Sequence, residues 1–147
     1  MEQKQAFEMI NKLSFFDNFT QEEKHSISTF DNQIWSFNSN DVIIKEGDLD
    51  NSFFILLKGL ATVIKSNSND MVLTTLQPGA VFGEISCILK RVRTTTVVAD
   101  GNAIALKIDT QNMDKLKPNI SSKLKDKLIE VLVKRLETIN SGDHQNL

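Results

Sequence analysis

Two charged residues, Glu84 and Arg93, lie nine positions apart, with Gly83 directly before the carboxylate and Thr94 and Thr95 directly after the arginine. A carboxylate can accept hydrogen bonds from a sugar hydroxyl, and a guanidinium offers a planar pair of donors that matches a phosphate better than a lysine does. Gly83 lets the backbone approach a ligand closely, and free N–H groups at the start of a short helix add affinity for an anion. These groups predict a site for a sugar phosphate.

The segment around these residues, 81–97, resembles the phosphate-binding cassette of cyclic nucleotide-binding domains, the cAMP and cGMP sensors. That cassette reads roughly Phe-Gly-Glu, then small and apolar residues, a short turn, and an Arg followed by small or hydroxyl residues. The resemblance implies that Glu84 holds the ribose 2′-hydroxyl and that Arg93 holds the cyclic phosphate. It also implies further ligand-binding residues around them: Gly83, Ile85, Ser86, Thr94 and Thr95. One departure is Val92, which stands where family members often have a proline.

Other short patterns extend the resemblance over about residues 13–140. They are the turn Glu-Gly-Asp at 46–48, the apolar phrase Phe-Phe-Ile-Leu at 53–56, and Pro-Gly at 78–79 shortly before the cassette. Each pattern is common by itself. Together with the cassette they make the identification specific.

The composition is that of a globular protein of one domain, with 147 residues of which 40% are hydrophobic and 24% charged. A net charge of −2 gives no general attraction to nucleic acid or to an anionic membrane. The longest apolar runs, 53–57 and 97–99, are far shorter than a membrane span, and no signal peptide is indicated at the start. A single Cys87 excludes an internal disulfide and fits a reducing compartment. We therefore expect a cytoplasmic protein without a nucleic-acid or membrane partner.

Periodicity predicts helices at the start of the chain and strands after them. Apolar residues at helical spacing predict a helix over 2–13, and the capping box at 20–23 begins a second helix that reaches about Phe30. Short apolar segments between turns then predict strands over 34–37, 42–44, 53–57, 61–64, 71–76, 95–99 and 103–108. A short helix at about 84–89 interrupts them. Many short strands with frequent turns favour a β-barrel, here a jelly roll in an α+β fold.

Two helices are predicted to close the chain, one over 109–116 that stops before Pro118 and a long amphipathic one over 121–140. In the family the last helix folds over the nucleotide as a lid, which makes Leu128 and Leu132 the candidates to cover the base. The apolar stripe of this helix also fits the seam of a homodimer. Its basic residues are predicted to form a solvated face: Lys123, Lys125, Lys127, Lys134 and Arg135.

These elements divide a single cyclic nucleotide-binding domain into parts. The expected parts are an N-terminal helical bundle (1–30), a jelly-roll barrel (31–108) that contains the cassette (82–96), C-terminal lid helices (109–140) and a tail (141–147).

The sequence gives little support to an enzyme. His25 and His144 have no second His or Cys at the spacing of metal ligands, and Cys87 is best explained as a small buried residue. No nucleophile–base pair accompanies the predicted pocket. We expect no catalytic residue, no metal and no cofactor, and cAMP or cGMP as the ligand.

The predicted function is a regulatory domain that binds a cyclic nucleotide, cAMP in preference to cGMP, and signals by repositioning its terminal helices. Its effector would be a separate protein or a fused domain outside this chain. The resemblance implies that a hydroxyl directly after the Arg, here Thr94, can contact guanine, but Thr94 fits a strand-favouring residue in a run of threonines equally well. The alternative function is a jelly-roll protein-interaction module that has lost nucleotide binding. Such a module would show no thermal shift with cAMP or cGMP, and Arg93→Ala would not affect its function.

Overall fold

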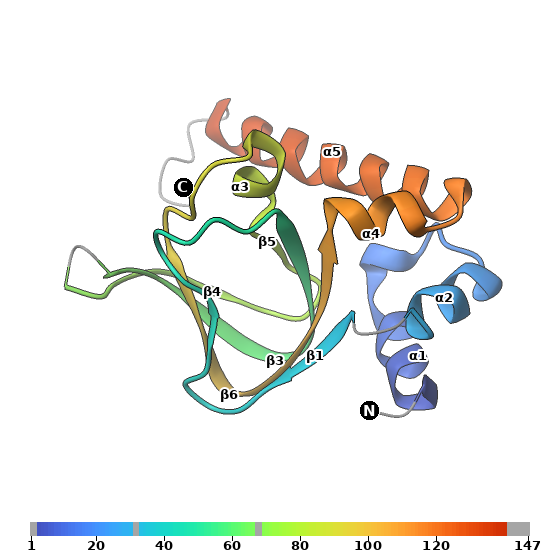
Figure 1. Cartoon of the computed structure of the whole chain (residues 1–147), viewed down its shortest axis with the longest axis horizontal. Coiled ribbons are helices and arrows are strands. Elements are labelled where there is room, and N and C mark those ends of the chain that lie inside the picture. Colours follow the sequence, from blue (N-terminus) through green and yellow to red (C-terminus); the bar gives the residue numbers. More distant parts are fainter. Residues whose placement is uncertain (1–2, 31–32, 67–68, 141–147) are drawn as a thin grey trace.

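The structure, a computed structural model, describes residues 3–30, 33–66 and 69–140. The predicted tail 141–147, and with it His144, lies outside these residues. Helices pack on the outside of a curved antiparallel sheet (Figure 1). The elements in chain order are α1 (Gln3–Lys12), a 3₁₀ turn (Ser14–Phe16), α2 (Gln21–Ser28), β1 (Ile34–Phe37), β2 (Val42–Ile44), β3 (Ser52–Lys65), β4 (Met71–Leu76), β5 (Val81–Phe82), α3 (Glu84–Leu89), β6 (Thr96–Asp109), α4 (Thr110–Lys115) and α5 (Pro118–Asn140).

Strands β3 and β6 organise the sheet. They pair antiparallel over most of their length, from Ser52 opposite Asp109 to Ile64 opposite Thr96. β1 and β2 pair with the two ends of β6, whereas β5 and β4 pair with the two ends of β3. The sheet curls around an interior, and α5 runs along its outside past α4 and α3 (Figure 1). This is the α+β jelly-roll fold that the sequence predicts. Its sheet is not closed into a complete barrel.

The two long strands correct the prediction, which divided each of them in two. Gly59 lies inside β3, at φ +84°, and a Cβ at this position would collide with the carbonyl oxygen of Asn102. The register with β6 shifts on both sides of Lys58. Gly101 similarly lies inside β6 at φ +76°. The strands therefore continue through positions where the local sequence predicts turns, because the hydrogen bonding to the partner strand continues. The glycines only bend the strands at these points.

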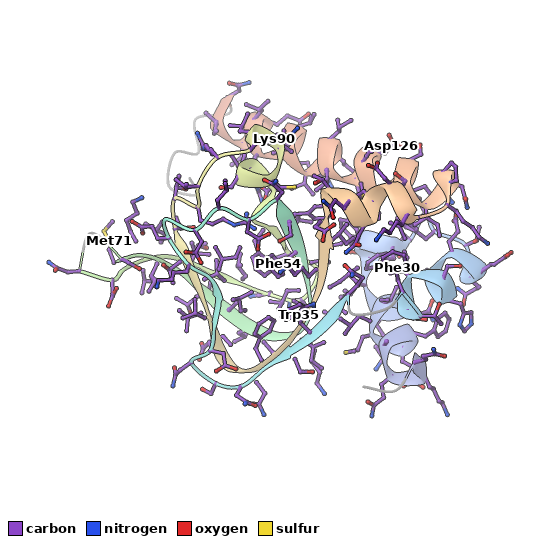
Figure 2. All side chains as sticks on the ribbon, viewed as in Figure 1. Phe30, Trp35, Phe54, Met71, Lys90 and Asp126 are labelled. Atoms are coloured by element: carbon purple, nitrogen blue, oxygen red, sulfur yellow. The ribbon has the colours of Figure 1, made fainter. Side chains whose placement is uncertain are left out.

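The apolar run in β3 is continuous because both faces of this strand are buried. Phe53, Ile55 and Leu57 belong to the core between the sheet and the helices. Phe54 and Leu56 belong to the core inside the barrel, where Figure 2 shows Phe54. Burial of each such side chain contributes about 1.5–3 kcal/mol. β3 therefore joins the cassette side of the barrel to the helical layer.

The helix ends follow local chemistry. The capping box is confirmed, since the Thr20 side chain accepts from Glu23 N and the Glu23 carboxylate accepts from Thr20 N. α5 begins at Pro118, earlier than the predicted start at Ser121, because a proline suits the first turn of a helix, where its missing N–H is not needed. Within the described residues, no helix is long and apolar enough to cross a bilayer.

A buried carboxylate connects α2 to α5. Glu23 Oε2 accepts from Asn119 Nδ2 at 2.6 Å, and Glu23 Oε1 pairs with Lys123 Nζ. Burial by itself raises the pKa of Glu23, but hydrogen bonds from Lys123, Thr20 and Asn119 more than offset it and lower the pKa from 4.5 to about 2. Lys123 was predicted to be solvated, which is wrong because it reaches this carboxylate across 100 residues of sequence.

Acid should weaken this connection between the N-terminal helices and α5. Because the folded pKa of Glu23 lies below its unfolded value, its contribution to stability is fully present above pH 4.5 and is lost as the pH falls toward about 2. The shift corresponds to at most about 3 kcal/mol of the free energy of unfolding. Urea unfolding followed by circular dichroism between neutral pH and about pH 2 measures it.

Glu23→Gln should lower the free energy of unfolding at neutral pH and flatten its decline in acid. Glu22→Gln is the matched control, since Glu22 is the exposed neighbour on the same helix. An equally steep decline in Glu23→Gln and in the wild type would contradict the assignment.

Candidate functional site

A pocket of about 230 Å³ opens between α3, the β3–β4 hairpin and the last turns of α5. All the predicted ligand-binding residues of the cassette line it: Gly83, Glu84, Ile85, Ser86, Arg93, Thr94 and Thr95. A larger cavity of about 480 Å³ lies between α1 and β3, but its charged side chains, Glu8, Lys12 and Lys58, are exposed. We regard the smaller pocket as the functional site because buried charges converge on it.

Gly83 allows the cassette to fold tightly around the arginine. It is the residue before α3 and has φ +78°, a left-handed conformation that favours glycine. A Cβ at this position would lie 2.9 Å from Arg93 Nη1 and 3.0 Å from Ile44 Cδ1. Any side chain here would therefore displace the guanidinium as well as strain the backbone.

Arg93 is buried, with 3% of its surface exposed. Its Nη1 donates to the carbonyl of Gly83 at 2.6 Å, and its Nη2 donates to the carbonyl of Ser52 at 2.6 Å. Asp50 Oδ2 is 3.9 Å from Nη2. Burial lowers the pKa of Arg93, and the neighbouring Asp50 opposes that effect. The result is a fixed, poorly solvated positive charge, which favours the entry of an anion.

Glu84 is equally buried, with 2% exposed, and it forms an ion pair with Arg135 of α5. Arg135 Nη2 also donates to the carbonyl of Val81 at 3.0 Å. Burial lowers the pKa of Arg135. Arg135 is 48% exposed, as a residue of the predicted solvated face should be, but the prediction did not foresee that it reaches a buried carboxylate. Its position, seven residues after the buried Leu128 on the same helix face, is the sequence signal that could have revealed it.

The two predicted lid residues do not line this pocket. Leu128 is buried in the core between sheet and helices, and it lies beside Cys87 around a separate cavity. Leu132 is half-buried. The α5 residue in the pocket is Arg135. Val63 and Leu76 of the β3–β4 hairpin contribute apolar lining that sequence reasoning did not single out.

The remaining reactive side chains have structural partners. Cys87 is buried and its thiol donates to the Asn51 carbonyl at 3.3 Å, as expected for a small core residue, and burial raises its pKa. The ring of His25 stacks on Phe7 at 3.8 Å between centroids. In the described part of the chain, no three His, Cys, Asp or Glu side chains gather in a way that could hold a metal ion.

Comparison with known proteins finds relatives that contain a cyclic nucleotide-binding domain. A family model for the cyclic nucleotide-binding domain matches residues 34–117, more than half of the chain. The chain is 34% identical over 100 residues to the cyclic nucleotide-gated channel beta-3 of Canis lupus familiaris, covering 65% of this chain and 13% of the channel. It is 26% identical over 114 residues to the cAMP-dependent protein kinase regulatory subunit of Dictyostelium discoideum, covering 74% of this chain and 35% of that subunit.

The chain thus corresponds to a minor part of these relatives. A crystal structure of a cyclic nucleotide-binding domain from Methylobacillus flagellatus shares the fold, with a TM-score of 0.73 over 92% of this chain and 78% of that chain at 23% identity. The family match includes the whole cassette, with Glu84 and Arg93 at the pocket. On these grounds, the chain belongs to the family of cyclic nucleotide-binding domains.

Proposed function

We propose that this chain is a regulatory domain that binds a cyclic nucleotide at the cassette pocket, with cAMP preferred to cGMP. The observation that carries the proposal is that Glu84 and Arg93, both buried and of opposite charge, line one pocket without pairing with each other. Arg93 binds the cyclic phosphate, and Glu84 accepts from the ribose 2′-hydroxyl. The base lies toward Val63 and Leu76 of the β3–β4 hairpin. Binding requires no covalent step, so the domain acts without catalysis.

Arg135 gives the ligand a direct influence on α5. In this structure it is bound to Glu84 and to the Val81 carbonyl. A nucleotide would bring a second negative charge, its phosphate, into a pocket that Arg135 already lines, and so it strengthens the docking of the end of α5. A ligand that prefers the docked helix shifts the population toward it. The effector that responds to this shift is a cytoplasmic partner protein or a fused domain outside this chain.

Arg93→Ala should abolish nucleotide binding. Two charge-assisted hydrogen bonds to the phosphate are lost, which corresponds to at least about a 100-fold loss of affinity. Isothermal calorimetry with cAMP and then cGMP measures this, and we expect the wild type to bind cAMP more tightly. A thermal unfolding curve of the variant shows whether it is folded, and Arg93→Lys keeps the charge in case it is not.

Arg91→Ala is the matched control, because Arg91 is an exposed arginine two positions away. Its affinity should equal that of the wild type. If the folded wild-type chain binds neither nucleotide, the domain is instead a protein-interaction module that has lost its ligand.

Arg135→Gln should weaken cAMP binding about three- to tenfold, since it removes one partly exposed charged contact. In the wild type, cAMP should slow amide hydrogen exchange in residues 131–140, and the substitution should reduce this protection. Lys134→Gln is the control, because the Lys134 side chain is 72% exposed and pairs only with Glu130 among the described residues. Equal protection of α5 in Arg135→Gln and in the wild type would exclude the proposed coupling.

We also propose that the outer face of α5 forms a homodimer seam. Ile129 and Leu136 are 59% and 58% exposed. With the half-buried Leu132 and Ile139 they repeat at intervals of three and four residues, the spacing of a coiled-coil seam. Sedimentation velocity should therefore detect a dimer that Leu136→Glu dissociates, whereas Glu137→Lys, a charge change on the neighbouring position, leaves it intact. A monomer at high concentration would refute the seam.

A further inference from the structure

Asp50 lies between two cations and is shared by them. Its Oδ2 is 3.9 Å from Nη2 of Arg93 and 3.6 Å from Nζ of Lys107. Its Oδ1 accepts from the Ser52 hydroxyl at 2.8 Å, which fixes the carboxylate at the start of β3. A single carboxylate at these distances cannot give its full attraction to either cation.

Lys107 is held in place from its other side by aromatic rings. Its Nζ lies 4.7 Å from the centroid of the Trp35 ring and 5.8 Å from that of Phe54. The register explains this, since Lys107 pairs with Phe54 across β3 and Trp35 pairs with Ala105, two residues before Lys107 in β6. Figure 2 shows Trp35 and Phe54 near each other. Trp35 is the single tryptophan of the sequence.

This arrangement bears on the charge of the phosphate site. An Asp50 that paired with Arg93 alone would compete with an incoming phosphate for the guanidinium. Lys107 neutralises part of that carboxylate and so leaves Arg93 more available. This partial neutralisation of Asp50 favours an anion at the guanidinium.

We propose that Lys107 is a positioning residue for the phosphate-binding arginine and acts through Asp50. This inference rests on the proposed function, since it concerns how the same pocket binds a phosphate. When Arg93 turns its donors to a phosphate, Asp50 moves its interaction to Lys107, and the ammonium shifts relative to Trp35. The indole ring of Trp35 therefore senses whether the pocket is occupied, because its emission responds to a charge over the ring.

The experiment measures cAMP affinity by calorimetry and Trp35 emission on the full chain. Lys107→Met should weaken binding about two- to fivefold, the range of a partly exposed ion pair, and Lys107→Arg should restore it. In an Asp50→Asn background, Lys107→Met should cause no further loss, since its effect passes through Asp50. The emission change on adding cAMP to the wild type should disappear in Asp50→Asn. Lys58→Met, an exposed lysine of β3, is the control and should change neither readout.

The outcomes separate this inference from the function on which it rests. If the wild type binds cAMP or cGMP and Lys107→Met binds equally tightly, the positioning role is refuted while the proposed function stands. An affinity loss that is just as large in the Asp50→Asn background also refutes it, because Lys107 would then act by packing or through another group. If the folded wild type binds neither nucleotide, the proposed function fails and this inference fails with it.

Discussion

The burial of one guanidinium, that of Arg93, is the constraint on which the site depends. Its donors are satisfied by carbonyls of Gly83 and Ser52, which belong to the cassette and to the start of β3. A buried charge that lost these partners would be strongly destabilising. The need to keep them explains the left-handed glycine at position 83, where a side chain would meet the guanidinium itself. The shape of the cassette therefore follows from how this charge is accommodated.

The two buried charges of the pocket remain available to a ligand because each has a different partner. Arg93 lies near Asp50, whereas Glu84 pairs with Arg135 from the far end of the chain. Had the two paired with each other, a ligand would have to break a buried ion pair before it could bind, which costs several kcal/mol. With separate partners, both groups still line the cavity. Each charge is thereby connected to a different part of the molecule. Arg93 is linked through Asp50 and Lys107 to strand β6, and Glu84 is linked through Arg135 to α5.

The helix α5 is held near both ends by ion pairs, each of which joins a buried carboxylate to a partly exposed cation. Near its start, Lys123 reaches the buried Glu23 of α2, where several hydrogen bonds converge on one carboxylate. Near its end, the half-exposed Arg135 reaches the pocket. Leu124 and Leu128 are buried between them. Under the function proposed above, a change in the pocket reaches the end of α5 through Arg135.

The sequence by itself determined what depends on neighbouring residues: the capping box at Thr20, the short cassette helix, and the spacing that brings Glu84 and Arg93 to one pocket. Such features are decided within about ten residues by backbone conformation and local hydrogen bonds. Only the tertiary structure decided that Arg135 binds Glu84 and that β3 and β6 continue through their glycines. Helical spacing can place Arg135 on the face of Leu128, but its partner Glu84 lies 51 residues away, and the second feature depends on a partner strand. Charged residues of a helix look alike in sequence, and it is the neighbouring surface that makes one of them solvated and another part of the site.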